Sequence, residues 1–285
     1  MLKIIIFIFF AHAAFSQLPE TDIWLFKLKK EKEILKLAEG NNFTSRKGYD
    51  NQPSFTPDGK NILYVGVYDE KQSDVYKYDI AKKIITQLTK TKESEYSPAY
   101  SPDNKSITCI TVEPDSVQQI WYYNLDGTRK KCVDPRIDSI GYYTWLNKDT
   151  LLYYKLTSPH SLHKFNTISK EDHWICDDPT RAFKKINNTI FIYGIKKDST
   201  EINYRVYHVL NKRSDEYANH KSKSEDFIWI NNIGLLKSEG AQILLYNEIH
   251  KTWPVLFDFS SYGIKKITRF TFDPKLKFIA IVDNP

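Results

Sequence analysis

The sequence predicts an all-β chain that folds as a six-bladed β-propeller with four antiparallel strands per blade. Three observations support this prediction. Aromatic residues make up 14% of the 285 residues, and Tyr alone occurs 19 times, which favours strands because these side chains pack well on a pleated sheet. A hairpin motif recurs six times along the chain, and a second, strand-like motif recurs six times in phase with it. Repeats of this length with four short strands are typical of propeller blades.

The hairpin motif is clearest at residues 53–60 and 98–105, which read Pro-Ser-Phe-Thr-Pro-Asp-Gly-Lys and Pro-Ala-Tyr-Ser-Pro-Asp-Asn-Lys. Pro presets the backbone at the first central position of a turn, and Gly59 supplies a left-handed residue without steric cost. Asn104 replaces Gly59, and Asn is among the few side chains that tolerate this conformation. Each copy is followed by an apolar run, so we expect a tight turn between the first and second strands of a blade.

Weaker copies of the hairpin motif continue toward the C-terminus. With Phe55 as the anchor, the equivalent positions are Phe55, Tyr100, Trp145, Lys185, Trp229 and Phe272, in steps of 40 to 45 residues. The second motif is an apolar strand, usually with an aromatic residue three positions after its first aliphatic one. Its copies lie at 22–27, 74–79, 119–124, 161–166, 205–209 and 242–247. A polar turn and a fourth strand follow each copy, which completes the blade.

The two ends of the chain supply complementary halves of one blade. Residues 22–39 read as a third and a fourth strand, whereas residues 270–282 read as a first and a second strand. Pairing these halves would close the ring and cover strand edges that otherwise invite aggregation. No stretch rich in Pro, Gly or Ser marks a linker, so we expect residues 17–285 to form a single domain.

Residues 1–16 read as a cleavable signal peptide. Lys3 is a short positive region, residues 4–10 form an unbroken apolar run, and Ala14 and Ser16 are small residues at the cleavage site. The apolar run is too short to cross a bilayer, which takes about 20 residues. We therefore expect export to the periplasm or out of the cell, without stable insertion in a membrane.

Charge and cysteine content disfavour other classes of protein. The formal net charge of +6 is mild for this length and the lysines are scattered along the chain, so we expect solvated lysines and no nucleic-acid binding. Three cysteines are an odd number and form no disulfide framework. We expect Cys109, in an apolar strand, to be buried, and a bridge between Cys132 and Cys176 stays open.

Residues that could carry catalysis are sparse. His160, His163 and His173 are the only histidine cluster; they fall across a turn, a strand and a further turn, whereas metal sites need fixed ligand geometry. Paired acids at 177–178 and 225–226 are expected to be solvated. The sequence has no Gly-x-Ser-x-Gly elbow, no His-Glu-x-x-His motif and no glycine-rich phosphate loop. We expect no catalytic residue, no metal and no cofactor.

The hairpins at 53–60 and 98–105 resemble the Ser-Pro-Asp-Gly-Lys repeat of the TolB-like propeller families. The Asp-Val-Tyr-Lys-Tyr-Asp strand at 74–79 and the Gln-Leu-Thr at 87–89 also look like these families. The motif covers the two blades between about residues 49 and 130, and periodicity carries the other four. The resemblance implies a six-bladed propeller that works outside the cytoplasm and contacts other proteins of the cell envelope. We expect no counterpart of the N-terminal α/β domain of TolB.

We expect any binding site to lie at the mouth of the central channel, where the loops between consecutive blades meet. These loops fall at 49–51, 93–96, 138–142, 177–181 and 222–226. Tyr49 with Asp50, and Tyr96 with Glu95, hold near-equivalent positions in neighbouring blades, and an aromatic ring beside an acid suits contact with a peptide or a basic surface. The alternative is that each acid caps a local turn and each Tyr packs between blades.

The sequence therefore predicts an exported, monomeric interaction scaffold that binds an unidentified protein of the envelope or the extracellular space. The alternative is a carbohydrate- or peptide-binding receptor that uses the channel mouth. A metal-dependent lactonase or hydrolase is a third interpretation. It is disfavoured because hard cations need several converging oxygen ligands, whereas the inner strands show mostly apolar, Pro and Tyr residues.

Overall fold

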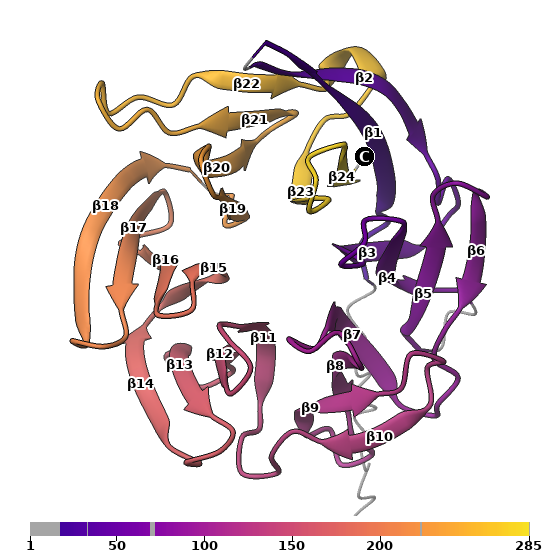
Figure 1. Cartoon of the computed structure of the whole chain (residues 1–285), viewed down its shortest axis with the longest axis vertical. Coiled ribbons are helices and arrows are strands. Elements are labelled where there is room, and N and C mark those ends of the chain that lie inside the picture. The colour runs from indigo at the N-terminus through magenta and orange to yellow at the C-terminus, as the bar shows by residue number, and fades with distance from the viewer. Residues whose placement is uncertain (1–17, 33, 69–71, 223, 285) are drawn as a thin grey trace, which may run out of the picture.

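The described part of the chain forms a closed ring of six sheets. A computed structural model describes residues 18–32, 34–68, 72–222 and 224–284, and the predicted signal peptide at 1–16 lies outside them. Within these ranges, twenty-four strands form six four-stranded antiparallel sheets. Figure 1 shows the sheets arranged around a central axis as blades. The predicted all-β, six-bladed propeller is confirmed.

Five blades are each built from four consecutive strands, with the first strand innermost and the fourth at the rim (Figure 1). Blade 1 contains β3 (Tyr49–Phe55), β4 (Asn61–Val67), β5 (Asp74–Asp79) and β6 (Ile84–Gln87). Blade 2 contains β7 (Ser94–Tyr100), β8 (Ile107–Val112), β9 (Gln118–Tyr123) and β10 (Arg129–Cys132). Blade 3 contains β11 (Ile140–Trp145), β12 (Thr150–Lys155), β13 (Ser161–Asn166) and β14 (Asp172–Asp177). The predicted anchors Phe55, Tyr100 and Trp145 end the three inner strands.

The next two blades follow the same plan. Blade 4 contains β15 (Pro179–Asn187), β16 (Ile190–Lys196), β17 (Glu201–His208) and β18 (Arg213–Lys221). Blade 5 contains β19 (Phe227–Ile230), β20 (Gly234–Glu239), β21 (Gln242–Leu245) and β22 (Val255–Asp258), and a short 3-10 helix, η1 (Ser260–Tyr262), follows it.

The sixth sheet, the closing blade, joins the two ends of the chain. Its order is β2-β1-β24-β23, formed by β1 (Asp22–Glu31), β2 (Ile34–Asn42), β23 (Ile267–Phe272) and β24 (Phe278–Asp283). β1 and β24 are antiparallel partners from Asp22 opposite Asp283 to Lys27 opposite Phe278. The predicted pairing of 22–39 with 270–282 is confirmed, although β2 continues to Asn42 and β23 begins already at Ile267.

The hairpin turns have the expected geometry. Gly59 has a φ of 72° and Asn104 a φ of 58°, both left-handed. In the first turn, Oδ1 of Asp58 accepts hydrogen bonds from the hydroxyl of Thr56 at 2.6 Å and from the amide of Lys60 at 3.0 Å. Asp103 makes the same two bonds in blade 2. In both turns the acid therefore stabilises the turn by accepting hydrogen bonds from groups of the same turn.

Apolar clusters fill the space between neighbouring blades. Among the described residues there are six such clusters, one for each interface in the ring. Phe26 of β1 is fully buried and meets the rings of Phe259 and Tyr262 edge-on, each at 4.8 Å between centroids. Cys109 is fully buried, as expected, and all three cysteines are free thiols. No helix in the described ranges is long and apolar enough to cross a membrane.

Candidate functional site

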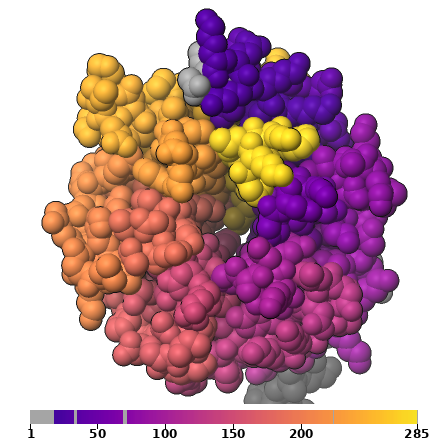
Figure 2. All heavy atoms as spheres, viewed as in Figure 1, coloured from indigo at the N-terminus to yellow at the C-terminus, as the bar shows by residue number. Residues whose placement is uncertain are grey.

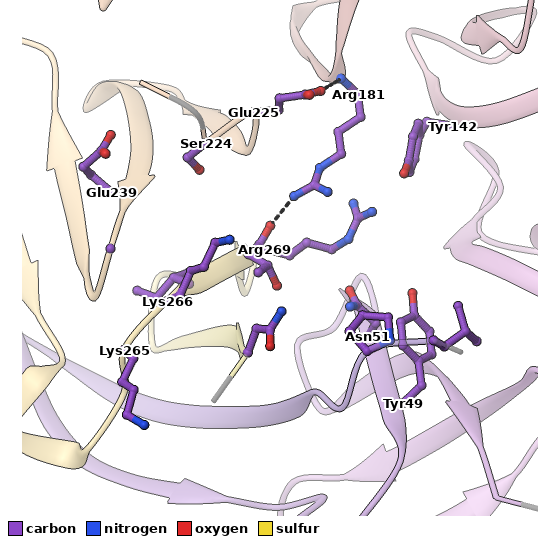
Figure 3. A pocket seen from close by; sticks show the side chains of 16 residues that line it. Tyr49, Asn51, Tyr142, Arg181, Ser224, Glu225, Glu239, Lys265, Lys266 and Arg269 are labelled. Carbon is purple, nitrogen blue, oxygen red and sulfur yellow. Dashed lines mark hydrogen bonds between the residues drawn. The ribbon is translucent and has the colours of Figure 1, made fainter. Parts of the chain in front are cut away.

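A cavity of about 620 Å³ opens at the centre of the ring, on the face where the loops between blades meet. An inner cavity of about 220 Å³ lies further along the inner strands and shares Tyr142, Arg181 and Arg269 with the outer one. Figure 2 shows the ring hollowed at its centre, and Figure 3 shows the side chains around the outer cavity. The two cavities together form a central channel with its mouth at the outer one.

The lining of this channel is basic. Lys265 and Lys266 lie at the outer cavity, Lys184 lies at the inner one, and Arg181 and Arg269 line both. These residues come from the strands β15 and β23 and from the loop that precedes β23. Elements far apart in the sequence therefore bring five cations to one channel.

Arg181 is fixed from two sides. Its Nη2 atom donates a 2.6 Å hydrogen bond to the carbonyl of Thr268, and its backbone amide donates to Oε2 of Glu225 at 3.0 Å. Its Nε atom is buried and has no hydrogen-bond partner within the described ranges. A buried N–H group without an acceptor destabilises the folded protein, and an acceptor on a bound ligand would remove this cost.

Arg269 lies beside Arg181, and Figure 3 shows both guanidinium groups pointing into the cavity. The carbon at the centre of the Arg269 guanidinium is 5.2 Å from the centroid of the Tyr142 ring, which is a cation–π contact. No hydrogen bond or ion pair engages this guanidinium among the described residues, so its N–H donors are available to a ligand.

The acids of the channel are already engaged. Oε1 of Glu225 lies 2.7 Å from Lys196, and Glu239 lies 2.8 Å from Lys237. Asp226 was predicted to be solvated, but it is buried. Its Oδ2 atom accepts a 2.8 Å hydrogen bond from the amide of Phe270. None of these carboxylates forms an ion pair with Arg181 or Arg269 among the described residues.

Lys184 shows the electrostatic consequence. Burial in the channel lowers the pKa of its ammonium group, the negative charge of Asp226 opposes this change, and the positive charges of Arg269 and Arg181 add to the lowering. The two arginines thus make Lys184 harder to keep protonated.

Of the four predicted site residues, the structure places Tyr49 at the outer cavity. Its ring is buried, and burial raises the pKa of its hydroxyl to about 12. Tyr96 lies instead against the apolar cluster between blades 2 and 3. It therefore packs between blades, as in the alternative interpretation.

The two predicted acids are fully buried and line neither cavity. Oδ1 of Asp50 accepts a 2.7 Å hydrogen bond from Arg46, and burial raises its pKa to about 6. Glu95 accepts hydrogen bonds from the hydroxyls of Thr89, at 2.8 Å, and Tyr123, at 3.2 Å, and burial raises its pKa to about 7. Both acids therefore accept hydrogen bonds in the protein interior and do not face the channel.

The reason lies in strand alternation. Asp50 in β3 and Thr180 in β15 are fully buried, whereas Asn51 and Arg181, one residue later, line the outer cavity. Adjacent side chains in a strand point to opposite sides, so in these two strands the residue after the buried polar one reaches the channel. Tyr96, which follows buried Glu95, lines neither cavity. Three of the other predicted loops do contribute Tyr142, Arg181 and Glu225.

The histidine cluster does not converge on a metal site. Nδ1 of His163 lies 3.3 Å from Asp172, and Nε2 of the same ring lies 3.0 Å from the hydroxyl of Ser161. His160 instead packs on the ring of Tyr154. No group of three His, Cys, Asp or Glu side chains in the described ranges has the arrangement of a metal site.

The fold and this channel define the chain as a six-bladed β-propeller with a basic channel mouth. Solved structures share this fold. A structure described as a TolB of Agrobacterium tumefaciens has a TM-score of 0.63 at 12% identity, covering 93% of this chain and 98% of the other. TolB of Acinetobacter baumannii has a TM-score of 0.58 at 13% identity, covering 92% of this chain and 63% of the other. The chain is thus structurally similar to the TolB propellers.

Enzymes share the same architecture. An oligogalacturonate lyase in complex with manganese has a TM-score of 0.54 at 11% identity, covering 95% of this chain and 98% of the other. No family model matches the sequence, and no curated protein matches it significantly. At these identities the likenesses show the fold alone, and function has to be argued from the channel.

Proposed function

We propose that this chain is an exported, non-catalytic propeller that binds a partner protein of the cell envelope or extracellular space at its channel mouth. The observation that carries this proposal is the convergence of Tyr142, Arg181 and Arg269 on one open cavity. Aromatic and Arg side chains are enriched where proteins bind one another, and they supply most of the binding energy there. The structural similarity to TolB propellers supports the same class.

A receptor for a carbohydrate or a short peptide is the second candidate. The volume of about 620 Å³ favours it, because small-ligand sites typically enclose about 300–1,000 Å³. Both candidates use the same mouth, so an experiment has to identify the occupant as well as the place.

Site-specific photo-cross-linking tests the proposal. A photoreactive residue at Lys265 lies at the mouth, whereas the same residue at Lys275 lies in the β23–β24 hairpin of the same blade, at the other end of the strands. Both positions are exposed. With envelope extract, we expect one protein adduct from position 265 and none from 275, identified by mass spectrometry.

Three results would contradict the proposal. Equal adducts from both positions would mean unspecific contact, and adducts with glycans or short peptides alone would favour the receptor. A divalent metal bound to the purified protein in stoichiometric amount would favour an enzyme.

A further inference from the structure

The channel holds more positive charge than it neutralises. Five lining cations, together with the two lysines that pair with lining acids, outnumber the three carboxylates by four within the described ranges. Like charges in a narrow cavity repel one another, and low-dielectric walls concentrate their field along the axis. A bound anion would relieve this repulsion.

Two donors at the junction of the cavities point to where that anion would lie. The buried Nε atom of Arg181 has no hydrogen-bond partner among the described residues, and no hydrogen bond or ion pair engages the guanidinium of Arg269 there. Two adjacent N–H groups of a guanidinium match the two oxygens of a carboxylate. The junction is therefore built for a carboxylate rather than for a neutral group.

We infer that the channel binds an acidic segment of the partner protein and that one carboxylate of this segment enters the inner cavity between Arg181, Lys184 and Arg269. This inference rests on the proposed function, since it names the chemistry of the partner at the same mouth.

The depth of the channel favours an extended peptide over a small free anion. The inner cavity, at about 220 Å³, is smaller than typical small-ligand sites and suits one side chain, whereas the outer cavity is large enough for several backbone units. Lys265 and Lys266 stand at the outer cavity, away from the junction. Cations at successive depths match successive carboxylates along a chain.

Calorimetry with defined probes tests the inference on the full-length mature protein. The probes are an acetylated, amidated hexaglutamate, the matching hexaglutamine, and citrate. We expect hexaglutamate to bind, hexaglutamine not to bind, and citrate to bind more weakly than hexaglutamate. Raising the salt concentration should weaken the binding, because exposed charges are screened.

Variants locate the site. Arg269→Gln should weaken hexaglutamate binding about tenfold or more, since a charged partner is lost. Arg269→Lys should weaken it less, because the charge stays and only the paired N–H geometry is lost. Arg213→Gln serves as the control, because Arg213 is 68% exposed and pairs with Asp215 at the start of β18. Circular dichroism confirms that each variant is folded.

Each contrary result has a separate meaning. Equal binding of hexaglutamate and hexaglutamine, or unchanged binding by Arg269→Gln, would overturn the carboxylate site. Tighter binding of citrate would assign the channel to a small anion and overturn the peptide. A cross-linked partner that persists in Arg269→Gln would leave the proposed function standing while this inference fails. Carboxylate binding without any cross-linked protein would overturn the partner protein and leave only the carboxylate site.

Discussion

The ammonium group of Lys237 lies 2.7 Å from Nδ1 of His220, although the two residues belong to neighbouring blades. Lys237 is fully buried and also donates to Glu239 at 2.8 Å. An ammonium group has only donors, so Nδ1 of His220 must accept and carries no proton. This contact joins blades 4 and 5, and both side chains lie against the ring of Trp253.

Acid should weaken this contact. Burial, and then the charge of Lys237, lower the pKa of His220 below its usual 6.5. Between the lowered folded pKa and the unfolded pKa, the unfolded chain binds more protons, so stability falls as the pH drops through and below 6.5. Urea unfolding at pH 7.5 and 5.5 should show a smaller acid-induced loss for His220→Gln than for the natural protein. The exposed His250→Gln should match the natural protein, and parallel losses in all three would contradict the prediction.

Glu95 should act in the opposite direction. Burial raises its pKa from 4.5 to about 7, so the folded state holds the proton more tightly, and stability contributed by the neutral acid is lost as the pH rises through this window. Glu95→Gln should gain up to about 3 kcal/mol relative to the natural protein between pH 4.5 and pH 8. Denaturation curves at the two pH values measure this, with the largely exposed Glu171→Gln as control. A constant difference would show that the pKa of Glu95 is the same in the folded and unfolded states.

Phe26 should be essential to ring closure. It is fully buried in the cluster between the closing blade and blade 5, and Phe→Ala at such a site costs about 3–5 kcal/mol. Leu210→Ala, at a residue that is 84% exposed, should change the free energy of unfolding by less than about 0.5 kcal/mol. Chemical denaturation of both variants checks this, and similar costs would mean that the closing interface is loosely packed.

A pair of glycines separates backbone strain from steric clash. Gly127 and Gly263 have φ values of 88° and 83°, but a Cβ on Gly127 would lie 2.0 Å from the carbonyl oxygen of Leu88, whereas nothing lies within 4 Å of a Cβ on Gly263. Gly263→Ala should cost about 1–2 kcal/mol from conformation alone. Gly127→Ala should cost clearly more, because backbone of blade 1 has to move. Thermal melting of the two variants compares them, and equal costs would contradict the clash.

The ring could be predicted from the sequence because its turns are encoded locally. Asp58 and Asp103 accept hydrogen bonds from backbone amides of their own turns, so the sequence marks these two turns directly. The period of the weaker copies predicted the other blades. The two halves of the closing blade could be recognised in the sequence because each carries two of the four strands of the blade repeat.

The position of the channel could be predicted from the sequence, but most of the residues that line it could not. Arg181 and Arg269 lie 88 positions apart in the sequence, and only the closed ring brings them beside each other. The acids chosen from the sequence, Asp50 and Glu95, were attractive because they are charged and near Tyr residues. A strand exposes alternate residues, and the phase of that alternation depends on how the strand is paired, which the sequence does not specify.

The closure by β1 and β24 makes the position of the chain's start arbitrary for the fold. Asp22 and Asp283 are directly opposite each other across the strand pair, so a short linker could join the two ends without disturbing any blade. New ends could then be opened in an outer turn, such as the β13–β14 turn near exposed Ile168, where insertions and breaks are tolerated best. The propeller should therefore tolerate circular permutation, and its six blades offer six nearly equivalent positions for new ends.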